Sequence, residues 1–261
     1  MTKAIPSYSL SDAGNKRDNN EDAYLSSGNI GLWAIADGMG GHEAGEVASA
    51  VTLKTFQSQV EAGQSLESAT QAAHQAVLDA VDDSVGAEGM GSTLVGLSSD
   101  DTTWKIVWVG DSRGYQWNKS SGLTPRTRDQ SLVQQLVDKG VITEEEARVH
   151  PNRNVIIQAL GQLDLEKPVV DTSSHDYEDG DMLLLCSDGL SDCVEDEAIN
   201  EIITAADNPE EAASNLVSRA LENGGKDNIT VIIVCLDRNN QKDVEMVCKK
   251  SFFQKLKKLE C

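Results

Sequence analysis

The sequence predicts one domain that mixes helices with strands, an α+β fold. Its 261 residues suit one large domain or two small ones, and 39% hydrophobic content is enough for a substantial core. Apolar residues recur at helical spacing over residues 43–81, and from Ser92 the period changes to two, as strands require. No repeat or low-complexity tract divides the chain, so we favour a single domain.

The N-terminal part is predicted to hold two strands followed by two helices. A short strand over 7–10 and a polar loop over 12–22 precede the apolar run 31–36, which is typical of a buried strand. Helices are expected over about 43–60 and 66–81, and Ser65 is a suitable N-cap for the second. The core face predicted for this second helix consists of Leu66, Ala69, Ala73, Val77 and Ala80.

Strands dominate residues 92–125. The segments 92–97 and 103–109 are predicted strands, and in the second Trp104, Ile106 and Trp108 share one face. This second run ends in Gly110-Asp111. Residues 113–117 are then expected to be the return strand of a hairpin, and residues 123–125 close the section.

Residues 127–161 interrupt the strand pattern and predict an inserted, mostly helical subdomain with helices over 131–139 and 144–148. The remaining predicted elements are strands at 169–171, 182–186 and 229–236, and a helix that Asn208-Pro209 opens and Gly224 ends. The domain is therefore expected to cover residues 1–237. Residues 238–261 are a basic, amphipathic tail, either a short packed or frayed helix or a docking or membrane-surface segment.

The composition excludes several classes of protein. Twenty-two Lys and Arg against 43 Asp and Glu give a net charge of −21, which would repel a nucleic-acid backbone. The five cysteines form no Cys-x-x-Cys pair, so neither a disulfide framework nor a structural zinc site is indicated. The N-terminus has no apolar segment of signal-peptide length, and no run is long enough to span a bilayer. We expect a soluble, cytoplasmic protein.

Acidic residues stand at the ends of several apolar runs, and some of them adjoin glycine. They are Asp22, Asp37, Asp111, Asp188, Asp192 and Asp227. If the strands belong to one layered structure, these carboxylates could converge, and converging carboxylates cannot all stay ionised without a cation. Oxygen ligands without His or Cys at matched spacing favour Mg²⁺ or Mn²⁺ over zinc.

The glycine-rich strand end Asp37-Gly38-Met39-Gly40-Gly41-His42 would let backbone approach a ligand closely, although a plain turn is the simpler interpretation of this segment alone. Two hard cations about 3.5–4 Å apart would activate a water and neutralise charge on a phosphoryl oxygen, which makes phosphoryl transfer the natural chemistry. Arg17, in the polar loop, has the bidentate geometry to hold phosphate oxygens, although a surface arginine is the simpler interpretation of this residue alone.

Taken together, these motifs resemble the metal-dependent protein phosphatase 2C (PPM) family, in particular its bacterial branch. The resemblance covers residues 7–236 and rests on six motifs that occur in the order and spacing of the family, since any single motif would be weak support. The segments are Gly14-x-x-Arg17-x-x-Asn20-Glu21-Asp22-Ala23, Asp37-Gly38-Met39-Gly40-Gly41-His42, Gly91-Ser92-Thr93, Gly110-Asp111-Ser112-Arg113, Ser187-Asp188-Gly189-Leu190-Ser191-Asp192 and Gly225-Lys226-Asp227-Asn228-Ile229-Thr230.

The resemblance implies a four-layer α-β-β-α sandwich with two central antiparallel sheets and a dinuclear Mn²⁺ or Mg²⁺ centre at one edge. It implies that Asp37 bridges both ions, that Asp22 and the Gly38 carbonyl complete one coordination sphere, and that Asp188 and Asp227 hold the other ion. The remaining implied roles are water-mediated binding by Glu21, a third, weaker ion at Asp111 and Asp192, phosphate binding by Arg17, and a mobile flap over 127–161.

Two positions depart from the family pattern. Met39 stands where eukaryotic members often carry a histidine that could protonate the leaving group, so a metal-bound water is the substitute we expect. The flap carries Arg128-Asp129-Gln130-Ser131 where many bacterial members have Asp-His-Ser. His42 receives no role.

The predicted function is hydrolysis of phosphoserine and phosphothreonine in proteins, in one step without a phosphoenzyme, reversing a partner Ser/Thr kinase in bacterial signalling. We expect a monomer that binds no nucleic acid. Two alternatives stay open: a phosphoprotein-binding module without activity, and a hydrolase of small phosphate esters on the same fold. A binding-only relative would be expected to lack one or more of the metal-binding acids, and here all are present.

Overall fold

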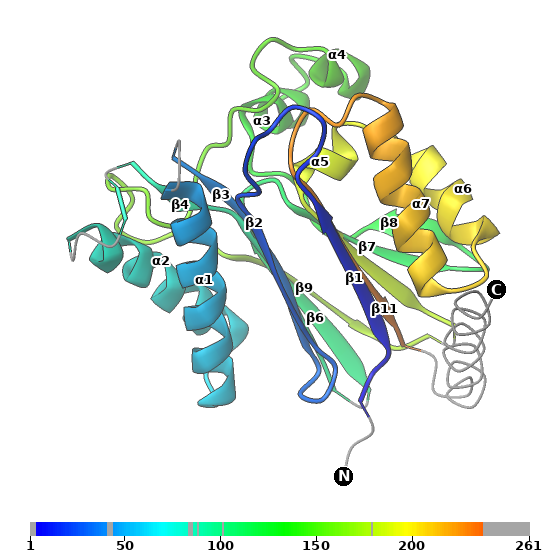
Figure 1. Cartoon of the computed structure of the whole chain (residues 1–261), viewed down its shortest axis with the longest axis horizontal. Coiled ribbons are helices and arrows are strands. Elements are labelled where there is room, and N and C mark those ends of the chain that lie inside the picture. Colours follow the sequence, from blue (N-terminus) through cyan, green and yellow to red (C-terminus); the bar gives the residue numbers. More distant parts are fainter. Residues whose placement is uncertain are drawn as a thin grey trace, which may run out of the picture.

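Two antiparallel sheets pack face to face, and helices cover the outer face of each (Figure 1). The computed structural model describes residues 4–40, 44–82, 86–87, 89–100, 102–178 and 180–236. Within these residues the α+β class and the four-layer arrangement are both confirmed. The predicted tail over 238–261 and His42 lie outside the described residues.

The sheet that contains the N-terminal strand is called here the β1 sheet. Its strands, in spatial order, are β1 (Ser7–Asp12), β11 (Ile229–Cys235), β10 (Met182–Cys186), β7 (Arg113–Asn118) and β8 (Gly122–Pro125). All neighbours in this sheet run antiparallel. The first and last segments of the domain therefore pair directly, because β1 lies beside β11.

The second sheet is called the β2 sheet. Its strands, in spatial order, are β2 (Asp22–Ser27), β3 (Leu32–Met39), β5 (Leu94–Ser99), β6 (Thr103–Val109) and β9 (Asp171–Asp176), and β4 (Gly91–Ser92) pairs with the end of β3. In this register Asp22 lies directly opposite Asp37. Two of the predicted metal-binding acids are thus neighbours across one strand pair.

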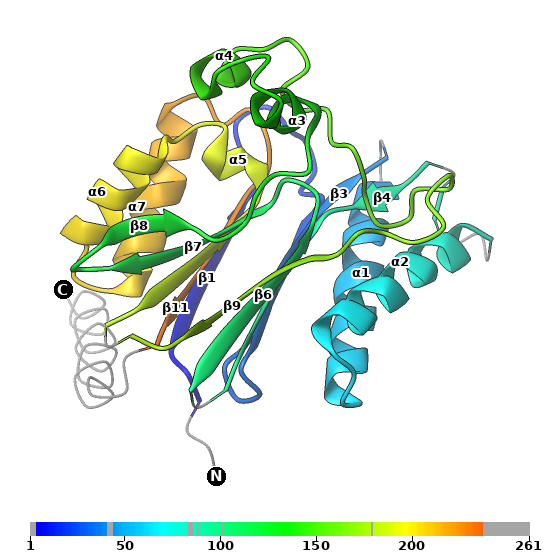
Figure 2. The same cartoon turned by 180° about the vertical axis from the view of Figure 1, so that it is seen from behind.

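Helices form the outer layers and one end of the molecule (Figure 2). They are α1 (Ala44–Glu61), α2 (Leu66–Asp82), α3 (Leu132–Asp138), α4 (Glu144–Arg148), α5 (Asp188–Ser191), α6 (Asp196–Ala205) and α7 (Pro209–Glu222). α1 and α2 cover the β2 sheet, and α6 and α7 cover the β1 sheet, whereas α3 and α4 sit above the strand ends. In the described part of the chain, no helix is long and apolar enough to cross a membrane.

The alternation predicted for residues 103–109 is confirmed, because the two faces of β6 serve two different cores. Trp104, Ile106 and Trp108 pack into the cluster between the two sheets. Val107 and Val109 instead pack into the cluster under α1 and α2. Burial of side chains of this size stabilises a fold by about 1.5–3 kcal/mol each, so the period-two pattern specifies the layering.

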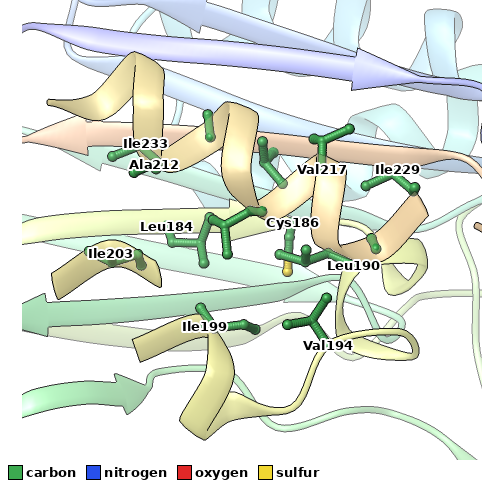
Figure 3. Packing of buried hydrophobic residues seen from close by; sticks show 14 of the residues in the cluster. Leu184, Cys186, Leu190, Val194, Ile199, Ile203, Ala212, Val217, Ile229 and Ile233 are labelled. Atoms are coloured by element: carbon green, nitrogen blue, oxygen red, sulfur yellow. The ribbon is translucent and has the colours of Figure 1, made fainter. Parts of the chain in front are cut away.

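A third cluster joins the β1 sheet to its helices (Figure 3). Leu184 and Cys186 of β10 and Ile233 of β11 are buried in one cluster with Ala212 and Val217 of α7. Burial raises the pKa of the Cys186 thiol to about 12, so this residue is a packed apolar side chain rather than a reactive one.

The helix signals read from the sequence are confirmed. The Ser65 hydroxyl accepts a hydrogen bond from the Ser68 amide at 3.2 Å, and Asn208 caps α7 by accepting from the Glu211 amide at 2.9 Å. The whole predicted core face of α2 is buried. The strands expected at 103–109 and 182–186 and the helix expected at 144–148 have the predicted bounds.

The predicted hairpin between residues 103–109 and 113–117 is wrong. β6 belongs to the β2 sheet and β7 to the β1 sheet, so the chain crosses from one sheet to the other through Gly110. Gly110 makes this crossing at φ +103°, a conformation that side-chain-bearing residues rarely adopt. Its amide donates to the Gln130 side chain at 2.8 Å rather than to a strand.

One further prediction needs correction, and one helix was missed. The strand expected at 169–171 begins only at Asp171, because both backbone groups of Val169 bond to side chains: its amide donates to Gln158, and its carbonyl accepts from Gln158 and Gln130. α6 was not predicted at all, although Ile199 and Ile203 are buried one turn apart on its core face.

Candidate active site

The strand-end acids gather at one end of the sandwich, beneath α3 and α4 (Figure 1). A pocket of about 610 Å³ opens there. Its walls are formed by Lys16, Arg17, Asp18, Asn19, Glu21, Asp37, Gly38, Met39, Gly40, Thr93, Asp111, Asn154, Ile156, Asp188, Asp227 and Asn228. The convergence expected from the sequence therefore holds for most of these acids.

Asp22 is held just behind the pocket wall by two hydroxyl groups. Its Oδ2 accepts hydrogen bonds from Ser187 Oγ at 2.8 Å and from Thr230 Oγ1 at 2.7 Å. Its Oδ1 is buried and has no hydrogen-bond partner. Burial outweighs these two hydrogen bonds and raises the pKa of the Asp22 carboxyl to about 6.

Asp37 and Asp188 face each other's charge across the pocket. Burial is the largest cause that raises the pKa of each carboxyl well above its ordinary value. The charge of Asp188 comes next for Asp37, whereas the charges of Asp111 and Asp192 come next for Asp188. Asp188 Oδ1 is buried without a partner, as is Asp22 Oδ1. Unpaired buried carboxylate oxygens are costly, so this arrangement calls for a cation.

Thr93 fixes the backbone that carries Asp37. The Asp37 amide donates to Thr93 Oγ1 at 3.1 Å, and the Thr93 amide donates to the Asp37 carbonyl at 2.9 Å. Thr93 Oγ1 also lies 2.7 Å from Ser112 Oγ, one residue beyond Asp111. Burial, followed by the charge of Asp129, raises the pKa of Asp111 to about 7.

Gly38 occupies a position that only glycine can fill. A Cβ atom at Gly38 would lie 2.0 Å from the Gly45 carbonyl oxygen and 2.7 Å from the Glu21 carbonyl oxygen, both of them backbone atoms. The Gly38 amide donates to that Glu21 carbonyl at 3.2 Å. β3, the loop before β2 and the start of α1 therefore meet at this point, which explains why the acidic turn needs glycine.

Arg17 is paired with an acid of the site. Its Nη2 donates to Asp227 Oδ2 at 2.7 Å, and this hydrogen bond raises the pKa of the guanidinium. Half of the Arg17 side chain stays exposed, at 52%, so the guanidinium borders the open side of the pocket. Glu21 lies close by against Gly45, and burial raises the pKa of its carboxyl.

Asp192 is the predicted ligand that the structure sets apart from the main pocket. It lies at the C-cap of α5, and its Oδ2 accepts a hydrogen bond from Asn154 of the flap at 3.0 Å. Arg153 Nε lies 3.9 Å from the same oxygen. The charge of Asp192 nevertheless contributes to the raised pKa values of Asp111 and Asp188, so it borders the acidic group.

Three residues that support the site received no role from the sequence. Asn228 accepts from the Glu21 amide at 2.8 Å and donates to two loop carbonyls, which orders the loop that carries Arg17. Gln130, in the flap segment that departs from the family pattern, is buried and receives the Gly110 amide. Asn154 and Asn228 also bond acids of the site directly, because Asn154 donates to Asp192 and the Asn228 amide donates to Asp227 at 2.9 Å. Polar loop residues of this kind carry no spacing signal.

The donor set fits hard cations. Carboxylate and carbonyl oxygens are the groups available, and none of the described residues lining the pocket is histidine or cysteine. In the described part of the chain, no three Asp, Glu, His or Cys side chains are gathered closely enough to hold an ion between them. The two unpartnered buried oxygens, Asp22 Oδ1 and Asp188 Oδ1, keep their full capacity to accept a cation.

Comparison with known proteins identifies this arrangement. The family model "Protein phosphatase 2C" matches residues 7–229, a span that contains every one of the strand-end acids. The chain belongs to the protein phosphatase 2C family. This result confirms the resemblance and the fold class expected from the sequence.

Individual relatives agree with this assignment. The chain is 41% identical over 241 residues to the Serine/threonine protein phosphatase PstP of Mycobacterium tuberculosis, covering 89% of this chain but 45% of PstP, about half its length. It is 34% identical to the Serine/threonine phosphatase stp of Listeria monocytogenes, covering 85% of this chain and 92% of the relative.

The fold also agrees with solved family members. The crystal structure of M. tuberculosis PstP/Ppp matches with a TM-score of 0.81 at 38% identity, over 90% of this chain and all of that one. The catalytic domain of PstP, solved in complex with two manganese ions, matches with a TM-score of 0.77 at 36% identity, over 89% and 98% of the two chains.

Proposed function

We propose that this protein phosphatase 2C member hydrolyses phosphoserine and phosphothreonine in proteins, and so reverses a Ser/Thr kinase. The observation that carries the proposal is the oxygen-only acidic pocket, with two buried unpartnered carboxylate oxygens beneath it and a half-exposed arginine at its edge. The manganese ions in the PstP structure and the names of the relatives support it. Action as a monomer in the cytoplasm remains part of the proposal.

We assign the ion-holding positions as the sequence predicts. Asp22, Asp37 and the Gly38 carbonyl would hold one ion, and Asp37, Asp188 and Asp227 the other; two such ions would activate a water and offset charge on the phosphoryl group. Glu21 would act through a water, and Asp111 and Asp192 would hold a third, weaker ion. The carboxylates would balance the positive charge of the ions. Hydrogen bonds from Ser187 and Thr230 hold Asp22 in position, and a hydrogen bond to Thr93 holds the backbone of Asp37.

Arg17 would orient the substrate. Its guanidinium now donates to Asp227, and a planar guanidinium can equally donate two parallel hydrogen bonds to phosphate oxygens. Since both partners are partly exposed, at 52% and 33%, an exchange of Asp227 for phosphate needs little rearrangement. Arg17 would then bind the phosphoryl group at the edge of the acidic pocket.

The leaving alkoxide would receive its proton from a water rather than from a side chain. Met39 lines the pocket at the end of β3 and cannot donate a proton. Among the described residues that line the pocket, none is a histidine that could take this role. We propose that one water attacks the phosphorus directly, so that no phosphoenzyme forms, and that a second water protonates the leaving alkoxide in place of a side chain.

Release of phosphate from a phosphothreonine peptide in the presence and absence of Mn²⁺ tests the proposal. We expect Mn²⁺-dependent release that Asp188→Asn abolishes, because this variant removes a buried carboxylate with an unpartnered oxygen that we assign to an ion. Asp164→Asn, at an exposed position away from the pocket, is the matched control. Full activity of Asp188→Asn would contradict the mechanism, and activity toward p-nitrophenyl phosphate alone would favour a small-ester hydrolase.

A further inference from the structure

A second pocket of about 390 Å³ adjoins the acidic one. The two share Asn154 and Asp227 as wall residues, so they are neighbouring compartments of one surface depression. The flap supplies one side of the second pocket through Arg148 and Arg153, and the loop before β11 supplies Lys226. This pocket is called here the basic pocket.

Cations are concentrated in this part of an otherwise acidic chain. The two adjoining pockets are lined by five of its 22 lysines and arginines, although Asp and Glu outnumber these residues by 43 to 22. The ion pairs explain only part of this concentration. Arg17 is paired with Asp227 and Arg153 approaches Asp192, so both of these cations already have a carboxylate partner.

Arg148 and Lys226 differ, because neither has a carboxylate within ion-pair distance among the described residues. Neither donates a side-chain hydrogen bond to any described residue, and both are exposed. Val149, whose side chain is 80% exposed, lies next to them in the wall of the same pocket. The basic pocket therefore offers two unpaired cations and an apolar rim.

We propose that the basic pocket binds a second anionic group of the phosphoprotein substrate, a carboxylate or a further phosphate close in sequence to the phosphorylated residue. The inference rests on the proposed function, since it gives that same active site a preference for acidic or multiply phosphorylated segments. An anion bound there would accept charge-assisted hydrogen bonds from Arg148 and Lys226, the two unpaired cations. It would also lie beside the compartment that the reacting phosphate enters.

A peptide is favoured over other polyanions as the occupant. With a net charge of −21, the protein repels extended nucleic acids, and the described cations form a small pocket rather than a long stripe. The local charge can still act on a short segment, because salt screens charges farther away than about 8 Å under physiological conditions. The exposed Val149 adds an apolar contact that a peptide side chain can use.

The test compares matched phosphothreonine peptides. One peptide carries only alanine around the phosphothreonine, and the others carry a single Glu or a second phosphothreonine in addition. The added residue stands at each position up to about four residues on either side, because four extended residues reach about 14 Å. We measure kcat/KM with Mn²⁺ for the wild type, for Arg148→Ala combined with Lys226→Ala, and for the control Lys139→Ala. Lys139 is an exposed flap lysine that lines neither pocket.

We expect the wild type to prefer the best doubly charged peptide by about fivefold, the effect of partly exposed ion pairs, and to lose this preference at high salt. The double variant should lose the preference and keep its rate on the alanine peptide, whereas the control keeps both. A preference for the second phosphate alone identifies a phosphate site, and an equal preference for Glu identifies a general anion site. Equal rates on all peptides in the wild type, or a preference that survives in the double variant, would overturn the inference.

Binding separates this inference from the proposed function. Fluorescence anisotropy with the same labelled peptides reports the preference even for a protein that hydrolyses none of them. If no peptide is hydrolysed, the proposed function fails. A binding preference that the double variant loses would still support the basic pocket, and equal binding of all peptides would overturn it.

Discussion

Replacing Asp22 by asparagine should stabilise the metal-free protein at alkaline pH. The Asp22 carboxyl is buried, its Oδ1 has no partner, and its pKa is raised from 3.8 to about 6. Because the pKa of Asp22 is higher in the folded state, the contribution of this carboxyl to the free energy of unfolding is complete below the unfolded pKa of 3.8. That contribution is lost as the pH rises through about 6. At pH 8 the shift corresponds to roughly 3 kcal/mol, at 1.36 kcal/mol for each pKa unit.

The size of the thermal effect follows from this free energy. Domains of about this length change their melting temperature by about 2–4 °C per kcal/mol, so Asp22→Asn should raise the metal-free melting temperature at pH 8 by up to about 10 °C. Asparagine keeps an oxygen that can accept from Ser187 and Thr230, so the local hydrogen bonds survive. At pH 4 the two proteins should melt at nearly the same temperature.

Manganese should act in the opposite sense. At a concentration of about one hundred times Kd, an ion bound only by the folded state adds about 2.7 kcal/mol, or about 5–10 °C. The wild type should gain this increment, and Asp22→Asn should gain little because it lacks a ligand. Differential scanning fluorimetry with EDTA and with Mn²⁺, at pH 4 and pH 8, measures all of these differences.

The exposed variant Asp164→Asn controls for the loss of one negative charge and should behave as the wild type does. A metal-free Asp22→Asn that melts below the wild type at pH 8 would show that its hydrogen bonds outweigh the charge. An unchanged response of this variant to Mn²⁺ would remove Asp22 from the ligand set. Either result refutes the reasoning.

Three further predictions concern single residues. Arg17→Ala should lower kcat/KM by about thirtyfold, the effect of a charge-assisted hydrogen bond to phosphate, and Arg17→Lys should recover part of it in a peptide assay. Gly38→Ala should cost about 1–3 kcal/mol in urea unfolding and lose the Mn²⁺ response, because its Cβ would overlap the Gly45 carbonyl. The buried His74 accepts a hydrogen bond from the Gly161 amide, and burial lowers the pKa of its imidazole. Its contribution to stability is therefore complete above about pH 6.5 and is lost as the pH falls below that value. In His74→Gln, the free energy of unfolding in urea should depend less on pH between pH 5 and pH 7, and an unchanged pH dependence would contradict this.

Local signals were sufficient wherever the deciding contacts lie close in sequence. Ser65 and Asn208 cap their helices through bonds that reach only three residues ahead. The two faces of β6 were predicted because each residue needs only its own polarity to select a core. For these elements, the physical cause is local and the sequence contains it.

The sheet in which a strand is placed depends on distant partners, and here local reasoning failed. Residues 103–109 and 113–117 have the pattern of a hairpin, yet their strands pair with β5 and β10 instead. The side chain that receives the Gly110 amide comes from Gln130, twenty residues away. Without that partner, a glycine followed by a polar residue predicts a turn.

The same distinction applies to the site. The acids were predictable as a group because strand ends in one layered fold can converge, and Asp22 and Asp37 do lie opposite each other. The groups that position them were not, because Thr93, Ser187 and Thr230 are ordinary hydroxyl residues until the fold brings them to a carboxylate. A sequence pattern predicts candidate ligands, and only the fold shows which groups hold them in place.

An acidic protein that attracts a phosphate ester must overcome its own charge at the point of entry. Around the acidic pocket, ionised carboxylates would repel a dianionic phosphate, and burial first and repulsion by neighbouring acids second raise the pKa of Asp37 and Asp188. Cations bound among them would reverse the sign at the centre, and Arg17, Arg148 and Lys226 supply positive charge at the edge. Because screening limits the remaining surface charge to short range, these few residues decide which segments can approach, and acidic segments gain where neutral ones do not.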